Sequence, residues 1–127
     1  NMMIQDPAMW DHEGEPILIT AFHEAMRMRF RRIAEENKEN SAAMKNRMNT
    51  FRERLRLQLS GAKTESQVRF ALMNLFSRSG HNAVLCDKWQ PVLKVIQRDW
   101  RLARDLGLLG LASYAGKGQS EEEGESR

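Results

Sequence analysis

One run of apolar side chains constrains the fold more than any other feature of this sequence. Met44, Met48, Phe51, Leu55 and Leu59 follow one another at intervals of 4, 3, 4 and 4 residues. Because an α-helix completes a turn in about 3.6 residues, all five side chains lie along one face of a helix. No segment of the sequence shows the alternating pattern of a strand. We therefore predict an all-α fold, a single bundle of four to five helices that bury their apolar faces against one another.

Two predicted helices flank a polar turn. The first covers residues 17–36, since Pro16 suits the first turn of a helix and apolar side chains then recur at helical spacing. Residues 35–41 are all polar, which favours a turn with Ser41 as the N-terminal cap of the second helix. We expect Gly61 to end that second helix in the left-handed conformation that glycine adopts easily.

Two further helices are predicted in the second half of the chain. Thr64 and Gln67 have the spacing of a capping box, which opens the third helix. Residues 81–87 then form a short connector with at most one helical turn. Asp87 is predicted to cap the fourth helix, which continues without a break to about Ala115.

The fourth helix carries the residues with the clearest packing role. Trp89 and Trp100 are eleven residues apart, three helical turns, and are expected in the core. Gly107 and Gly110 each weaken a helix by about 1 kcal/mol relative to alanine, so we expect a neighbouring backbone to approach closely there. Cys86, the single cysteine, is expected to be a small buried residue; it excludes an internal disulfide and fits the reducing cytoplasm.

Charge divides the chain into three parts. Residues 16–116 hold 18 lysines and arginines against nine acids, a net charge of +9, and form the predicted basic helical bundle. Residues 1–15 carry four acids and are predicted to be an acidic N-terminal arm; we expect Asn1 to be the remnant of a cleaved tag. Residues 117–127 carry four glutamates and are predicted to be an acidic, flexible tail. A basic body of this kind attracts polyphosphates at long range.

Many of the basic side chains form rows at helical spacing, and arginine outnumbers lysine 14 to 6. Arginine binds phosphate through two parallel hydrogen bonds, so these rows are candidate nucleic-acid contacts, although a charged row can also be simply a solvated face. The candidate nucleic-acid-binding residues are Arg27, Arg31, Lys45, Arg52, Arg56, Lys94, Arg98, Arg101 and Arg104. Such contacts would be independent of base sequence and sensitive to salt.

Catalysis has little support in the sequence. The three histidines are scattered, and the sequence has no P-loop, GxGxxG or GxSxG motif. No cluster of histidine, cysteine and carboxylate residues has metal-ligand spacing. We therefore predict that the chain is not an enzyme, with no catalytic residue, metal site or cofactor. The longest apolar stretch is also far too short to cross a membrane.

Two segments carry a resemblance to a known family. Residues 99–118, DWRLARDLGLLGLASYAGKG, resemble the C-terminal helix of the large subunit of type I CRISPR effector complexes, of the I-B-like kind found in cyanobacteria and myxobacteria. Residues 69–80, RFALMNLFSRSG, also resemble this region of the large subunit. The resemblance therefore covers roughly residues 65–118. In several type I systems this helical region is also made separately, as the small subunit of the Cascade complex.

The resemblance implies a non-catalytic small subunit that acts in antiviral defence in the cytoplasm. Its implied partners are the backbone and large subunits of the effector complex, the guide RNA, the target and displaced DNA strands, and further copies of itself. It would stabilise the complex and leave sequence reading to guide-strand pairing. Two alternatives remain open: a helical protein–protein interaction module that makes no nucleic-acid contact, and a free-standing DNA-binding regulator.

Overall fold

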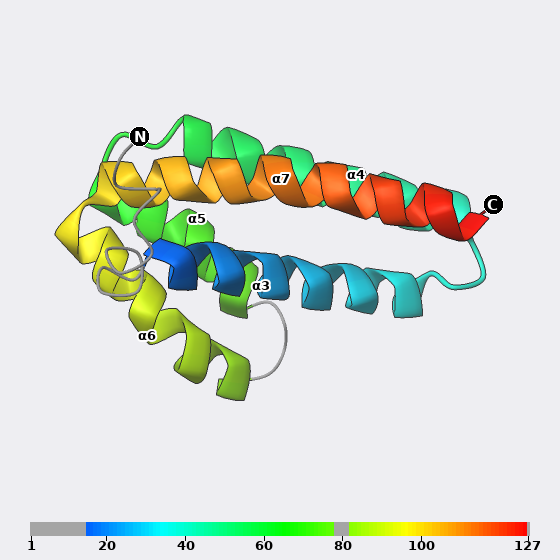
Figure 1. The fold of residues 1–127 in the computed structure, drawn as a ribbon, viewed down its shortest axis with the longest axis horizontal. Coiled ribbons are helices and arrows are strands. Elements are labelled where there is room, and N and C mark those ends of the chain that lie inside the picture. Colours follow the sequence, from blue (N-terminus) through cyan, green and yellow to red (C-terminus); the bar gives the residue numbers. More distant parts are fainter. Residues whose placement is uncertain (1–14, 78–81, 127) are drawn as a thin grey trace.

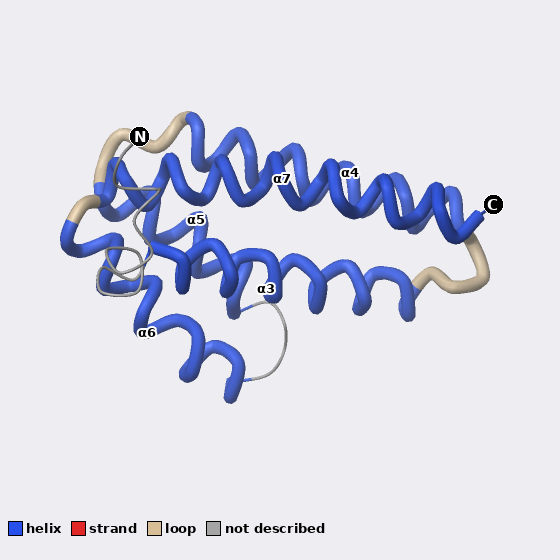
Figure 2. Tube along the Cα trace, in the orientation of Figure 1, coloured by secondary structure: helices blue, strands red, loops and turns tan. Residues whose placement is uncertain are grey.

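The computed structural model describes residues 15–77 and 82–126, with side chains described for 17–76 and 88–114. In these ranges the chain forms five helices and no strand, so the predicted all-α fold is confirmed (Figure 2). The helices are α3 (Glu15–Glu36), α4 (Ser41–Ser60), α5 (Glu65–Ser77), α6 (Asn82–Arg98) and α7 (Trp100–Ser126).

Three long helices run side by side, and two shorter ones pack at one end of them (Figure 1). α3 and α4 form an antiparallel pair, and α7 lies along both and runs in the same direction as α3. α5 and α6 pack against each other and against α3. The five helices share one continuous apolar core, whose largest fully buried side chains include Leu18, Phe22, Met26, Leu59, Leu72, Leu75, Phe76 and Ile96.

The α3–α4 turn lies where the polar segment predicted it, over residues 37–40. Its cap, however, is Asn40 and not Ser41, since the Asn40 Oδ1 atom accepts a hydrogen bond from the Ala43 backbone N–H at 3.1 Å. The prediction for Gly61 was also wrong, because its φ of −88° lies in the right-handed region. The helix stops there with ordinary backbone geometry.

The capping box at the start of α5 is confirmed. The Gln67 backbone N–H donates to the Thr64 hydroxyl at 3.2 Å. The Gln67 side chain accepts in return from the backbone N–H of Lys63 at 2.6 Å, one residue earlier than the usual partner. These two bonds fix the direction in which the chain enters α5.

The predicted fourth helix is wrong in two respects. α6 begins at Asn82, so Asp87 lies inside the helix and does not cap it, and residues 82–87 are helical, not a connector. The helix also ends at Arg98, and Asp99 separates it from α7. The Asp99 Oδ1 atom accepts from the Leu102 backbone N–H at 3.2 Å, which caps α7.

Packing around α6 and α7 agrees with part of the core prediction. Trp89 is buried and its ring lies 5.7 Å from that of Phe76, as expected for core, whereas Trp100 is half-buried at the edge of the core. Gly107 and Gly110 do mark close approach, but by side chains and not by a backbone. A β-carbon at Gly107 would lie 3.1 Å from Leu59 Cδ1, and one at Gly110 would lie 3.1 Å from Phe22 Cδ1.

The terminal predictions are less fully covered by the structure. Asn1 and almost all of the N-terminal arm lie outside the described residues, as does the Cys86 side chain. α7 continues as far as Ser126, through the segment predicted to be a flexible tail. The division into arm, bundle and tail stays a prediction.

Candidate nucleic-acid interface

A groove between α3 and α4 is lined by four arginines. Arg29 and Arg32 come from α3, and Arg47 and Arg54 come from α4. On each helix the two arginines are three or seven residues apart, which places them on one side of that helix. We call the groove that these four residues line the arginine groove. It has a volume of about 290 Å³ and is also lined by Ile33, Glu36, Thr50 and Phe51.

Glu36 is the one carboxylate among the residues that line the arginine groove. It accepts from Arg32 Nε at 3.4 Å and from Arg47 Nη1 at 3.1 Å, and so joins the two helices across the groove. The Glu36 side chain is 46% exposed, and those of Arg32 and Arg47 are exposed to a similar degree. Solvent therefore screens both ion pairs. Four guanidinium groups against one carboxylate leave a net charge of +3 on this surface.

Arg29 anchors the inner wall of the arginine groove. It is buried at 8% exposure, donates from Nη2 to the Asn74 carbonyl of α5 at 3.1 Å, and lies 4.4 Å from the centre of the Phe51 ring. A second cavity of about 170 Å³ shares Arg29, Phe51 and Arg54 with the groove and extends it towards α5. Arg54 is exposed and makes no hydrogen bond or ion pair with any described residue. The groove thus combines the fixed positive charge of Arg29 with the positive charge of Arg54, which is accessible to a ligand.

The predicted row on α4 lies on the other side of that helix. Arg52 donates to the Asn49 side chain at 3.0 Å and packs over the Phe30 ring, 5.2 Å from its centre, so it is held in place. Lys45 is exposed and has no described ion-pair partner. Of the predicted residues of this row, Lys45 is the one whose charge is both accessible and uncompensated.

Arg56 in the same row is compensated by a neighbour. Its Nε and Nη2 atoms both donate to the Glu53 carboxylate, which makes a two-bond ion pair one helical turn apart. The hydrogen bonds from Arg56 lower the pKa of Glu53, and the same bonds raise the pKa of Arg56. A phosphate would therefore have to displace Glu53 before it could bind Arg56.

The predicted stripe of Lys94, Arg98, Arg101 and Arg104 crosses the break at Asp99 and so does not lie on one helix. Lys94, Arg98 and Arg101 are exposed, and the Arg101 guanidinium lies 4.6 Å from the centre of the Trp100 ring. Arg104 is half-buried, and it donates to the Ala62 carbonyl at 3.4 Å and pairs with Asp105 at 3.1 Å. The structure thus gives Arg104 a role in packing.

Arg27 and Arg31 are exposed on α3 but do not line the arginine groove. They differ from Arg29 by two residues, and side chains two residues apart on a helix point in nearly opposite directions. None of the nine predicted residues lines the arginine groove, whose four arginines the fold brings together. Sequence reasoning missed that set because it considered each helix alone. The available signal was the tight turn at 37–40, which fixes how α3 and α4 align.

Metal clusters and membrane-spanning helices are both absent from the described part of the chain. Among those residues, no three histidine, cysteine, aspartate or glutamate side chains come close enough to hold a metal ion. None of the helices searched there is long and apolar enough to cross a membrane.

Comparison with known proteins places the chain in a family. The model of the DevT C-terminal domain matches residues 5–127. The chain is also 47% identical, over 108 residues, to the CRISPR-associated protein Cas8a1/Csx13 of Myxococcus xanthus. That match covers 84% of this chain but 19% of the relative's length, and no solved structure matches. The resemblance to the C-terminal region of a CRISPR large subunit is confirmed, and the chain belongs to the DevT C-terminal domain family.

Proposed function

We propose that this chain is a non-catalytic part of a type I CRISPR RNA-guided DNA-targeting complex, in which it binds nucleic-acid backbone without reading sequence. It acts as the small subunit, equivalent to the C-terminal helical region of the large subunit. The membership of the DevT C-terminal domain family and the CRISPR-associated relative support this assignment. Its partners are the backbone and large subunits, the guide RNA, the target and displaced DNA strands, and further copies of itself, all in the cytoplasm.

The observation that carries the proposal is the arginine groove. Arginines from two helices line one concavity of about 290 Å³, and a single carboxylate accompanies them. A phosphodiester fits such a site, because guanidinium groups donate two parallel hydrogen bonds to phosphate oxygens. Arg29 is held by its hydrogen bond to Asn74 and would need little reorganisation to bind. Lys94, Arg98 and Arg101 add exposed positive charge elsewhere on the bundle.

The test is binding of labelled mixed-sequence single- and double-stranded oligonucleotides to the full chain, followed by fluorescence anisotropy from about 50 to 200 mM salt. Binding that weakens steeply with salt and ignores sequence supports the proposal. A doubly substituted groove variant, Arg47→Gln with Arg54→Gln, should lower the slope of log Kd against log salt by about 2, one per lost phosphate contact. Circular dichroism should show unchanged helix content.

A matched control removes the same charge outside the groove. Arg27→Gln with Arg31→Gln changes two exposed arginines of α3 and leaves the groove intact. If both double variants lose affinity equally, the groove has no special part and only net charge matters. No binding at the lowest salt would favour the protein–protein interaction module, and preference for one duplex sequence over a scrambled one would favour the free-standing regulator.

A further inference from the structure

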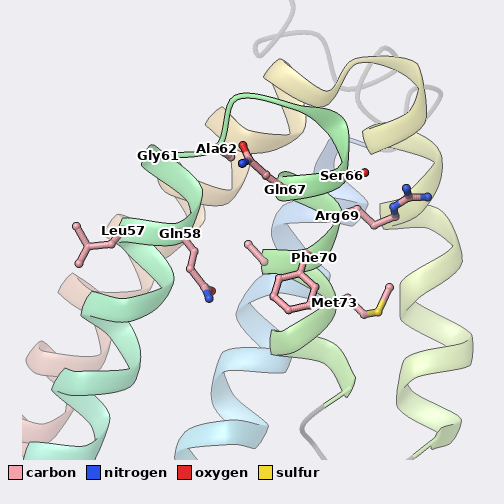
Figure 3. A pocket seen from close by; sticks show the side chains of 10 residues that line it. Leu57, Gln58, Gly61, Ala62, Ser66, Gln67, Arg69, Phe70 and Met73 are labelled. Carbon is pink, nitrogen blue, oxygen red and sulfur yellow. The ribbon is translucent and has the colours of Figure 1, made fainter.

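A second concave surface, between α4 and α5, is apolar. Five large apolar side chains are well exposed among the described residues, and three of them line this surface: Leu57 at 56%, Phe70 at 62% and Met73 at 37% exposure. Its volume is about 620 Å³, and Gly61 and Ala62 of the α4–α5 connection line it at one end. Figure 3 shows Phe70 of α5 between Gln58 on the α4 side and Met73 on the α6 side. We call it the α4–α5 groove.

We propose that residues 1–14 of the same chain dock in the α4–α5 groove. The proposal is independent of the proposed function, since it uses no nucleic-acid contact. Clustered exposed apolar side chains rimmed by polar ones mark an interaction surface. The question is which occupant the chemistry of the groove selects.

The apolar lining and the positive charge of the groove together favour an occupant that is both apolar and acidic. No carboxylate is among the ten residues that line it, whereas Arg69 is. Arg54 lies beside it on a surface that shares Leu57 and Gln58, where Glu53 is held by Arg56. Neither Arg54 nor Arg69 makes a hydrogen bond or ion pair with a described residue.

Residues 1–14 are both apolar and acidic in sequence. It contains five large apolar residues, three acids and no lysine or arginine: Met2, Met3, Ile4, Met9 and Trp10, with Asp6, Asp11 and Glu13. A second copy of the bundle is a poorer occupant of this groove, because residues 16–116 carry +9 and the groove itself is lined by Arg69 and by no carboxylate.

The connection to α3 puts the groove within reach. α3 begins at Glu15, at the same end of the bundle as the α4–α5 connection (Figure 1). Fourteen extended residues span up to about 46 Å. The 20 residues of α4 extend only about 30 Å, so the tether is longer than the helix that forms one wall of the groove.

Photo-crosslinking in the full chain tests the proposal. A benzophenone amino acid replaces Phe70, which is 62% exposed and tolerates a larger aromatic group. After irradiation and proteolysis, mass spectrometry should find the crosslink within one chain, to a peptide from residues 1–14. The same amino acid at Leu109, on α7 and 48% exposed, should give at least several-fold less of that product.

Charge substitutions test the acidic part of the argument. Arg69→Glu should lower the yield of the crosslink at least several-fold, whereas Lys38→Glu, in the α3–α4 turn, should leave it unchanged. Crosslinks between two chains would show that a second copy, and not the N-terminal arm, occupies the α4–α5 groove. Equal yields from positions 70 and 109, or no crosslink to residues 1–14, would overturn the proposal.

Discussion

Leu55→Ala tests whether the apolar stripe of α4 is the part of the molecule that holds the bundle together. Leu55 is 2% exposed and belongs to the common core. Leu57 lies two residues further along the same helix, with 56% of its surface exposed. Substituting each leucine by alanine compares the same chemical change on two sides of one helix, with the same effect on helix propensity.

The expected loss at Leu55 follows from its burial. The substitution removes three carbon groups, each contributing about 0.8 kcal/mol when buried, or roughly 2.4 kcal/mol of transfer free energy. The cavity left behind adds a further cost, so the free energy of unfolding should fall by about 2–5 kcal/mol. For 127 residues this corresponds to a decrease in Tm of about 7–19 °C. Leu57→Ala should cost less than about 1 kcal/mol.

Urea denaturation followed by far-UV circular dichroism measures both losses, with a thermal scan as the second readout. The m-value should be the same for the parent chain and both variants, since all three should expose nearly the same surface area on unfolding. A loss below about 0.5 kcal/mol for Leu55→Ala, or equal losses for the two leucines, would show that the stripe does not face the core.

Three further outcomes are expected. Asn40→Ala should cost about 1 kcal/mol of stability in urea denaturation, because it removes the cap of α4, whereas Ser41→Ala should cost nearly nothing; the reverse order would restore Ser41 as the cap. Gly110→Leu should cost about 1–3 kcal/mol in the same assay, since even its β-carbon would lie 3.1 Å from a buried phenylalanine ring, and an unchanged stability would argue against this close packing of α3 and α7. Glu53→Gln should leave stability within about 1 kcal/mol and strengthen single-stranded DNA binding at low salt, because it frees Arg56; weaker binding would contradict the assigned role of Glu53.

The helices that could be predicted are those whose signals are local. The stripe from Met44 to Leu59 identified α4 because helical spacing within one segment needs no knowledge of the rest of the fold. The Thr64–Gln67 pair identified the start of α5 for the same reason, since both of its hydrogen bonds join near neighbours in the sequence. The polar turn between α3 and α4 was placed correctly, with its cap displaced by one residue.

The break between α6 and α7 could not be predicted from periodicity. Apolar residues continue at helical spacing across it, with Ile96, Trp100 and Ala103 all packed in or against the core. The N–H of Asp99 donates to the Val95 carbonyl at 2.9 Å at the end of α6, and the Asp99 carbonyl accepts from the N–H of Ala103 at 3.0 Å at the start of α7. In the sequence the only sign of the break is Asp99, and an exposed aspartate inside a helix has the same sequence signature.

The arginine groove depends on the register between two helices, which spacing within one helix cannot supply. Residue numbers of facing pairs in α3 and α4 sum to between 80 and 83, as in Arg29–Phe51, Phe30–Phe51 and Glu36–Arg47. This near-constant sum follows from an antiparallel pair closed by a turn of four residues, 37–40. Sums in this range place Arg29 opposite residues 51–54, a stretch that includes Arg54, and both arginines line the same groove. The predicted turn already contained this information, so the register of the hairpin, applied to charged positions as well as apolar ones, was enough to bring these arginines together.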